Sequence, residues 1–533
     1  MILLLERSEN RIAILLLISA VIFSGIALRY YKIAVRPVYT ETSSENRFIT
    51  ISVGESQGTI YDRNMKRIVN SQYNYIGVIV PKMFRAEDVI NLAQNKAEFM
   101  VNFLKGRPFS FRCTKDTEES VGLTVFKIPE RYSENQSARH IIGYLSENKG
   151  MDGLEYAYDS ILRNGKIQNS VSYSTDGFGN VLIGDGKNVV RSMKDYTGVV
   201  TSINLEIQQI CENAGKSIEK GTIIVSETET GDILALASFP QYSPENIEDA
   251  LKNPDLPLIN RALYSYSVGS VFKLVTACHA LQNGSEHFFY NCNGNINIFG
   301  QSFNCHKPEG HGLQNMTKAI VNSCNTYFIA MSRNFKPENF RETARSLGFG
   351  REIYLCSGIT ASAGVLPTVS DLEIPAELAN FSFGQGKLSA SPMQINQLTC
   401  TIANSGKLPV MRLIKGLTTD GKTVANEKNP NLSRAISEDT AMKLREMMIS
   451  AVEESTNSNA KSETVKTGAK TSTAQTGQYD ENGNEICHAW ITGFFPAENP
   501  KYAVTVLVEG GGYGNDASAP VFREIAEKIM QIQ

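Results

Sequence analysis

The chain has 533 residues, of which 42% are hydrophobic and 20% are charged. These proportions are typical of globular protein, and the length predicts more than one domain. The formal net charge is only −3 and the basic residues are scattered, which argues against a protein that binds nucleic acid through a basic face.

An apolar run near the N-terminus predicts a membrane anchor. Residues 12–28 carry no charge and lie between Arg11 and Arg29. The run is slightly short for a hydrocarbon core of ~30 Å, but Arg29 and the two tyrosines after it can extend the span to the interface. No small-residue cleavage site follows, so we expect an uncleaved helix over residues 12–31. Basic residues flank the run on both sides and do not decide its orientation.

The segment after the anchor predicts a stalk and then a non-catalytic module. Residues 33–50 are polar and contain Pro37, as a stalk would. Residues 51–195 mix short strand-like and helical runs, and no group of nucleophile and base stands out among them. The strand-like runs lie at residues 76–80 and 123–128, and a helical run lies at 86–104. A new unit begins at residues 199–204.

The C-terminal part of the chain predicts one sheet flanked by helices. Turn residues from Thr230 to Asp232 separate two β-rich runs, which predicts a hairpin. Apolar residues at helical spacing predict helices between and after the strands. The expected strands are 222–227, 233–238, 490–495 and 502–508, and the expected helices are 205–218, 271–281 and 520–532.

Ser270 and Lys273 are the first residues that indicate chemistry. Ser270 opens an apolar helix, where a serine commonly serves only as a helix cap. Lys273 lies three residues on, so one helical turn brings its amine beside the hydroxyl. The apolar neighbours would bury the lysine and lower its pKa, as a general base requires. Two other Ser-x-x-Lys matches, at residues 217–220 and 458–461, lack such a setting.

Ser323 and Asn325 lie together between two helix-like segments. The simplest interpretation is a polar pair that caps the next helix. The alternative is catalytic, because a hydroxyl can relay a proton to a leaving group and an amide can orient a peptide bond.

A cationic strand provides the third element, and two lysines compete for it. Lys466 begins the literal Lys-Thr-Gly triad, and Lys470 precedes a Thr-Ala-Gln-Thr-Gly run four residues further on. A shift of four keeps the same face of a strand, so strand periodicity cannot choose between the two lysines. The alternative for either is an exposed lysine on an edge strand.

The nine cysteines do not form the spacing of a disulfide framework. Cys292 and Cys305 could pair if the domain lies outside the cell, and otherwise we expect free, partly buried thiols. Cys305, His306 and His311 also suggest zinc, but their spacing fits no standard zinc motif. The residues alone leave these alternatives open.

Several segments in their order resemble the class B penicillin-binding proteins, the monofunctional transpeptidases of bacterial peptidoglycan. Residues 58–64 resemble the motif of their pedestal domain, although Gln57 replaces an arginine and Met65 a glycine. Ala469 and Ser472 stand where the third motif has glycine. The segments that carry the resemblance are 58–64, 140–145, 153–155, 230–240, 260–262, 269–273, 312, 323–325, 384–386, 391–394 and 470–477.

The resemblance implies a mixed α+β and α/β architecture, the penicillin-binding transpeptidase fold with an antiparallel sheet flanked by helices. It also implies an elongated N-terminal pedestal and one N-terminal transmembrane helix, with the bulk of the chain outside the cytoplasm in the bacterial cell membrane. The implied divisions are a cytoplasmic tail (1–11), the anchor (12–31), a pedestal or dimerisation domain (32–195) and a transpeptidase domain (196–533).

The resemblance implies a reaction that needs no metal and no organic cofactor, and it assigns roles to the candidate residues. Ser270 attacks the D-Ala-D-Ala carbonyl of a pentapeptide stem and Lys273 takes its proton. Ser323 passes a proton to the departing D-Ala, and Asn325 orients the substrate. The Thr-Ala-Gln tail aligns Lys470 with the third-motif lysine and leaves Lys466 as the alternative. Lys470 and Thr473 hold the substrate carboxylate, and the expected substrate-binding residues are Thr471, Ser472, Thr473 and Gln475.

The partners implied are peptidoglycan pentapeptide stems, β-lactams, the membrane, a membrane glycosyltransferase and other proteins of cell-wall synthesis. Two alternatives stay open at this point. A β-lactam sensor or β-lactamase shares the serine and lysine but usually lacks a large pedestal. A catalytically weak scaffold of the wall-synthesis complex is suggested by Ser472, whose side chain could crowd the substrate backbone.

Overall fold

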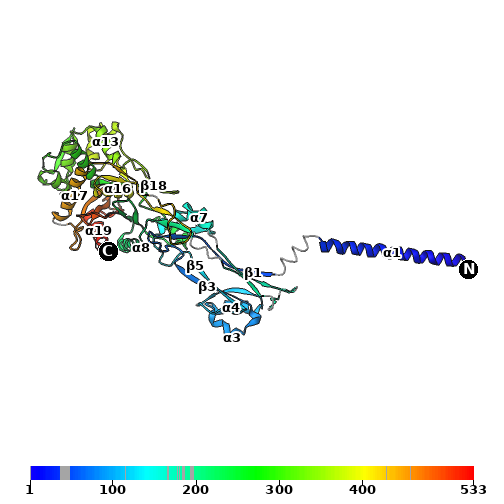
Figure 1. The fold of residues 1–533 in the computed structure, drawn as a ribbon. Helices are drawn as coiled ribbons and strands as arrows, with labels where there is room; N and C mark the ends of the chain where they lie inside the picture. The colour runs from blue at the N-terminus through cyan, green and yellow to red at the C-terminus, as the bar shows by residue number, and fades with distance from the viewer. Residues whose placement is uncertain are drawn as a thin grey trace. The chain divides into compact units, whose positions relative to one another are not determined.

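The fold was obtained as a computed structural model, which describes residues 2–35, 48–114, 116–164, 167–176, 178, 180–182, 186–191, 197–427, 429–455 and 458–533. Helix α1 (Ile2–Val35) contains the apolar run, and its part from Arg11 to Val35 is long and apolar enough to cross a membrane. The prediction of one N-terminal apolar helix is confirmed, with a longer helix than expected (Figure 1). Most of the predicted stalk lies outside the described residues.

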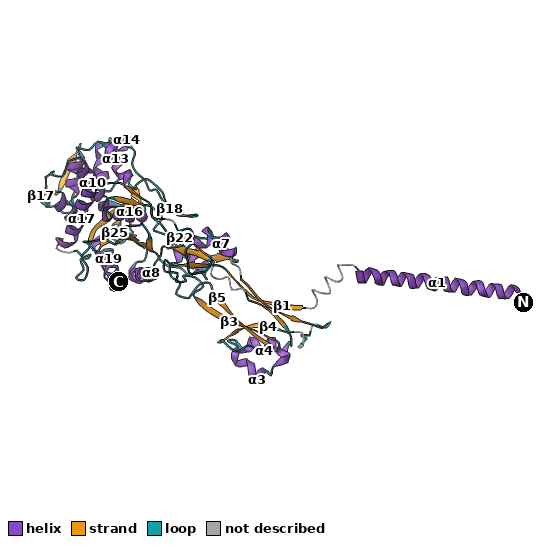
Figure 2. Ribbon diagram, viewed as in Figure 1, coloured by secondary structure: helices purple, strands orange, loops and turns teal. Residues whose placement is uncertain are grey.

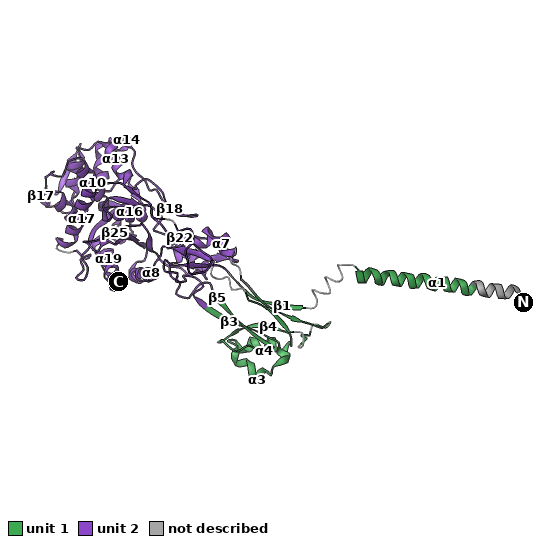
Figure 3. Cartoon of the chain, viewed as in Figure 1, with its two compact units in different colours: residues 1–56, 73–129, 167–193 green, residues 57–72, 130–166, 194–533 purple. Residues whose placement is uncertain are grey.

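The contacts divide the chain into two compact units (Figure 3). Unit 1 comprises residues 1–56, 73–129 and 167–193, and unit 2 comprises 57–72, 130–166 and 194–533. This division differs from the expected single boundary between residues 195 and 196. The physical reason is strand pairing, because β2 (Thr59–Tyr61) pairs in parallel with β10 (Gly198–Thr201), which also pairs with β22 (Ile414–Thr418).

Unit 1 contains two three-stranded sheets and a helical segment (Figure 2). The predicted helix over 86–104 is wrong as one element. It is broken into α3 (Ala86–Val89), a 3-10 turn and α4 (Lys96–Leu104), because the Asn95 side chain accepts a hydrogen bond from the Glu98 amide and starts a new helix. The sheets are β1-β8-β9 and β4-β3-β5, with strands β1 (Phe48–Ser56), β3 (Gln72–Ile79), β4 (Phe109–Cys113), β5 (Leu123–Glu130), β8 (Ile167–Ser174) and β9 (Lys187–Val190).

Unit 2 is built on a five-stranded antiparallel sheet in the order β12-β11-β26-β25-β24. The predicted hairpin is confirmed, since Ile223 of β11 faces Ala237 of β12 across the ladder. Strand β24 lies at one edge, which leaves one side of its backbone for other partners. The strands are β11 (Gly221–Glu227), β12 (Ile233–Phe239), β24 (Gly468–Tyr479), β25 (Glu485–Phe495) and β26 (Tyr502–Val508).

Helices cover both faces of this sheet, as the sequence predicts. Along β11, Ile223 and Val225 pack with α8 (Leu205–Ala214) and α19 (Ala519–Gln531), whereas Ile224 points the other way, into a core shared with Met393 of α16 (Pro392–Ala403). The buried Thr399 of α16 also hydrogen-bonds Thr492 of β25.

The predicted helix over 271–281 is α10 (Lys273–Gln282), and a 3-10 turn (Gly269–Phe272) precedes it. Phe272 anchors this junction, because its buried ring contacts the rings of Phe349 and Phe381. The Trp490 indole in β25 donates to the Ser267 carbonyl just before the turn. These contacts fix Ser270 and Lys273 relative to the sheet.

A buried ion pair holds the two early segments of unit 2 together. Arg131 donates to both carboxylate oxygens of Glu155, at 2.7 and 2.5 Å, and Glu155 is fully buried. The Arg131 guanidinium also donates to the Gly58 carbonyl at 2.6 Å. The pair therefore joins residues 57–72 to residues 130–166.

We expect Glu155→Gln to lower the free energy of unfolding of unit 2 by about 3–5 kcal/mol, because it leaves the Arg131 charge buried and uncompensated. The single tryptophan of the chain, Trp490, lies buried in the sheet of unit 2, so its fluorescence in a urea titration reports this unit. The exposed Glu134 provides the matched control, and Glu134→Gln should leave the transition in place. An unchanged midpoint for Glu155→Gln would contradict the role of the pair.

Candidate active site

Ser270 lies in the 3-10 turn that precedes α10, and Lys273 is the first residue of that helix, one turn further on. The Lys273 amine is 3.0 Å from the Ser270 hydroxyl oxygen, as the three-residue spacing predicts. The other Ser-x-x-Lys matches differ, because Lys220 and Lys461 form ion pairs with Asp255 and Glu453. Both amines are thus paired with carboxylates and not placed against a serine hydroxyl as Lys273 is.

Lys273 is fully buried and surrounded by neutral oxygen atoms. Its amine also contacts the Ser323 carbonyl at 2.6 Å, the Ser323 hydroxyl at 3.1 Å and the Asn325 side-chain oxygen at 2.7 Å. Burial holds the pKa of Lys273 well below its usual range, and the positive charge of Lys470 lowers that pKa further. A lysine in this state can accept a proton from Ser270.

Ser323 and Asn325 lie on a strained turn at the start of α12 (Asn325–Ser332). Ser323 has φ of 48°, in the left-handed region that a non-glycine residue adopts at a cost. The turn directs its hydroxyl between the two lysines, since Lys470 donates to the same oxygen at 3.2 Å. The Asn325 amide nitrogen donates to the Asn304 carbonyl at 3.3 Å.

The two third-motif lysines have different surroundings. Lys470 lies in β24, is buried, and reaches Ser323. Burial lowers the pKa of Lys470 to about 8. Lys466 precedes β24 and is exposed, and it does not line the cleft beside Ser270. The geometry therefore places Lys470, and not Lys466, beside Ser323 in the cleft that contains Ser270.

Ser472 lies against the segment that carries the nucleophile. Its hydroxyl donates to the Val268 carbonyl at 2.9 Å, and the side chain is only 3% exposed. Gly269 faces it with φ of 63°, and a Cβ there would lie 2.4 Å from the Ser472 oxygen and 3.1 Å from the Thr473 carbonyl. Gly269 therefore allows the turn that contains Ser270 to approach the edge strand. The hydrogen bond from Ser472 to Val268 then stabilises this close approach.

A cleft of about 450 Å³ opens over these residues. Its walls include the predicted residues Thr471, Thr473 and Gln475, and Gln475 lies at the exposed end of the strand, bound to Glu485. The sequence analysis did not assign several further lining residues. They are Asn304, Cys305, His306, Phe383, Gln385, Cys487, Tyr513, Gly514 and Asn515. Of these, Cys305 and His306 stood out in the sequence only as possible zinc ligands, and the Gly-Gln-Gly segment around Gln385 was a further signal.

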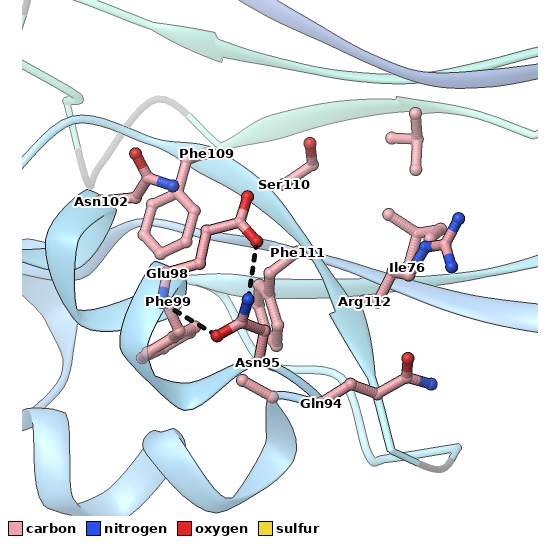
Figure 4. A pocket seen from close by; sticks show the side chains of 12 residues that line it. Ile76, Gln94, Asn95, Glu98, Phe99, Asn102, Phe109, Ser110, Phe111 and Arg112 are labelled. Carbon is pink, nitrogen blue, oxygen red and sulfur yellow. Dashed lines mark hydrogen bonds between the residues drawn. The ribbon is translucent and has the colours of Figure 1, made fainter.

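Unit 1 contains a separate hollow, of about 540 Å³ (Figure 4). Phe99 lies in its wall, and its ring contacts those of Phe109 and Phe111 edge-on. The Glu98 carboxylate accepts a hydrogen bond from the side-chain amide of Asn95. The residues that line this hollow include no lysine or histidine beside Ser110, so they do not form a nucleophile–base pair.

Together, a serine beside a buried amine, a second hydroxyl and a lysine on an edge strand define an acyl-transfer site. Residues 221–527, more than half of the chain, match the penicillin-binding protein transpeptidase domain. The chain belongs to this family and is a class B penicillin-binding protein. The predicted family and fold are therefore confirmed.

Individual relatives cover most of the chain. It is 26% identical to the peptidoglycan D,D-transpeptidase MrdA of Acinetobacter baumannii, over 91% of this chain and 82% of the relative. Penicillin-binding protein A from M. tuberculosis, solved as its penicillin G acyl-enzyme complex, is 26% identical with a TM-score of 0.63 over 79% of this chain and 97% of that one. A chain of a solved peptidoglycan synthase complex is 22% identical with a TM-score of 0.70, over 98% of this chain and 99% of that one, which shows the fold.

We expect Ser472→Ala to lower the free energy of unfolding by about 1–2 kcal/mol, because the buried Val268 carbonyl loses its donor. The exposed Ser433 provides the control, and Ser433→Ala should leave the urea midpoint of Trp490 fluorescence unchanged. Ser472→Gly should not accelerate acylation by penicillin, because the side chain points to Val268. Faster acylation of Ser472→Gly would contradict this geometry and indicate a crowded cleft.

Proposed function

We propose that this protein cross-links peptidoglycan as a serine D,D-transpeptidase, with Ser270 as the nucleophile. The observation that carries the proposal is the Lys273 amine, which lies within hydrogen-bond distance of both the Ser270 and the Ser323 hydroxyl and is buried away from water. The same cleft is open to solvent and bounded by the edge strand β24, along which an extended peptide can bind.

In the first half-reaction, the Ser270 oxygen attacks the carbonyl carbon of the D-Ala-D-Ala bond while neutral Lys273 accepts the hydroxyl proton. The carbon–nitrogen bond then breaks, Ser323 passes a proton to the departing D-Ala amine, and an ester on Ser270 remains. The Lys470 ammonium and the Thr473 hydroxyl hold the terminal carboxylate. The backbone amides of Ser270 and Thr473 stabilise the oxyanion.

In the second half-reaction, an amine of another stem attacks the ester carbonyl. The new amide bond forms the cross-link, and Ser270 leaves with a proton returned through Lys273. Asn325 keeps the Lys273 amine in place through its side-chain oxygen, at 2.7 Å, in both steps. A β-lactam enters as an analogue of the same substrate and leaves Ser270 acylated.

The location and the partners follow from the substrate. Helix α1 anchors the chain in the bacterial membrane with residues 1–11 in the cytoplasm, and unit 2 acts on stems outside it. The sequence of residues 51–195 shows none of the glycosyltransferase carboxylate motifs of the bifunctional class A enzymes, and polymerisation then depends on a membrane glycosyltransferase partner. The relative with the broadest structural coverage described above is itself part of a peptidoglycan synthase complex.

The direct test is labelling of the full-length protein with a fluorescent penicillin, followed by mass mapping of the modified peptide. We expect a long-lived adduct on Ser270 that is absent from Ser270→Ala. Ser217→Ala, at an exposed copy of the same spacing, should label normally. No adduct on folded protein would favour the scaffold function, and rapid release of the bound penicillin would favour a β-lactamase.

We expect the acylation rate to fall above pH 8. The pKa of buried Lys470 is about 8, so its positive charge and its hold on the carboxylate are lost as the pH rises through that value. The rate should fall by about tenfold per pH unit on that limb. Lys470→Arg is the matched control, because arginine stays protonated and should remove the alkaline decline. An unchanged decline in Lys470→Arg would show that another group causes it.

A further inference from the structure

The loop that follows β26 forms part of the wall of the catalytic cleft. Strand β26 ends at Val508, and the chain leaves the sheet there. The next residues, 509–514, contain glycine at positions 510, 511, 512 and 514, and we call them the glycine loop. Tyr513 and Gly514 of this loop line the same cleft as Ser270. The position of the loop therefore shapes the site where the substrate binds.

Two backbone amides hold the start of the glycine loop against β25. The Gly510 amide donates to the His488 imidazole nitrogen Nδ1 at 3.2 Å. The Gly512 amide donates to the Cys487 carbonyl at 3.1 Å. Both glycines have φ in the left-handed region, 63° and 71°, which glycine adopts without strain. His488 is therefore the side chain that fixes where the loop begins.

The state of the His488 ring suits this hydrogen bond. Because Nδ1 receives an N–H group, it carries no proton, and the neutral ring has its proton on Nε2. Burial holds the pKa of His488 below its usual range, which favours the neutral ring. The ring also packs edge-on against the Tyr266 ring, with the centroids 5.5 Å apart. This contact limits the orientations that the imidazole can adopt.

An ion pair fixes the residue just before Gly510. The Glu509 carboxylate accepts a hydrogen bond from the Tyr266 hydroxyl at 2.7 Å and another from the Arg261 Nε at 2.9 Å. The Arg261 side chain is only 4% exposed. Tyr266 thus contacts both Glu509 and the ring of His488, so the start of the loop and the imidazole are held in register.

The far end of the glycine loop meets Thr473, the residue proposed to hold the substrate carboxylate. Gly514 begins α18 (Gly514–Ala517), and its amide donates to the Thr473 hydroxyl oxygen at 3.4 Å. A Cβ at Gly514 would lie 2.4 Å from the Ser472 carbonyl oxygen and 2.5 Å from that of Trp490, so the loop lies directly on both strands. A hydroxyl oxygen that accepts this amide hydrogen keeps its own proton for a different acceptor.

We propose that His488 is a positioning residue for substrate binding, and this inference rests on the proposed function. By holding Gly510, His488 keeps the Gly514 amide on the Thr473 oxygen and so directs the Thr473 proton toward the substrate carboxylate. Without the imidazole, the loop loses its first attachment and the Thr473 hydroxyl loses its fixed direction. The role concerns the carboxylate alone, so removal of the ring should cause a selective loss.

The first test compares benzylpenicillin with its methyl ester as acylating agents of the full-length protein in detergent. We expect His488→Ala to lower the second-order rate constant for benzylpenicillin by about tenfold, because a hydrogen bond to a charged group is lost. The rate constant for the ester should fall by less than about twofold, since the ester carries no charge for Thr473 to stabilise. An equal loss for both compounds would show a general structural defect and overturn the proposal.

Two further histidine variants complete this test. In His488→Gln the side-chain oxygen can accept from the Gly510 amide, so this variant should recover most of the rate with benzylpenicillin. The exposed His287 provides the matched control, and His287→Ala should react as wild type with both compounds. A His488→Gln variant as slow as His488→Ala would contradict the hydrogen bond to Gly510.

A double-mutant cycle tests whether His488 acts through Thr473. In a Thr473→Val background the hydroxyl is absent, so His488→Ala should cause no further loss with benzylpenicillin. Losses that add fully would overturn the path through Thr473.

Amide hydrogen exchange measures the loop without using the reaction. In His488→Ala the peptide that covers residues 509–514 should exchange at least about tenfold faster than in wild type, and in His287→Ala it should not change. Unchanged exchange in His488→Ala would overturn the positioning role even where Ser270 labels normally. Wild-type protein that never labels with penicillin would refute the proposed function instead, and the exchange result would still decide whether His488 holds the loop.

Discussion

The structure depends on a lysine amine buried without a counter-charge. Within the described residues, no carboxylate lies at ion-pair distance from Lys273, and its partners are hydroxyl, carbonyl and amide oxygens. Such surroundings favour the neutral amine, because desolvation penalises the ammonium more than neutral dipoles can offset. The ring of Phe272 and the helices around it bury the amine. The same hydrophobic packing that stabilises the fold therefore also lowers the pKa of the base.

The second wall of the cleft is an exposed sheet edge. Edge strands bind extended chains readily, and most proteins cover or charge them. Here β24 is kept open beside Ser270, and it carries Lys470 on the face that meets Ser323. Gly269 and Ser472 set the distance between the nucleophile and this edge. The substrate would thus extend the sheet by one strand, with its reacting bond beside the serine.

Local chemistry could be predicted from the sequence, but convergence of distant segments could not. The three-residue spacing of Ser270 and Lys273 fixes their contact within one turn, and the turn residues from Thr230 to Asp232 between two β-rich runs predicted the β11–β12 hairpin. Strand period could not separate Lys466 from Lys470, because only the packing around β24 exposes one and buries the other. Cys292, Cys305, His311 and Cys324 are separated by 13, 6 and 13 positions, and only the fold around the pairing of β14 (Tyr290–Cys292) with β17 (Gly312–Gln314) brings their side chains within 4.8 Å of one another.

Strand β2 and the Arg131–Glu155 pair limit where the chain can be cut if unit 2 is to be produced alone. The chain leaves and re-enters unit 2 before residue 194, so this unit is not a simple C-terminal fragment. A protein that starts at residue 196 would lack β2, one of the two strands that pair with β10, and would expose that edge of the sheet. Residues 73–129 and 167–193 of unit 1 are thus inserted between segments of unit 2.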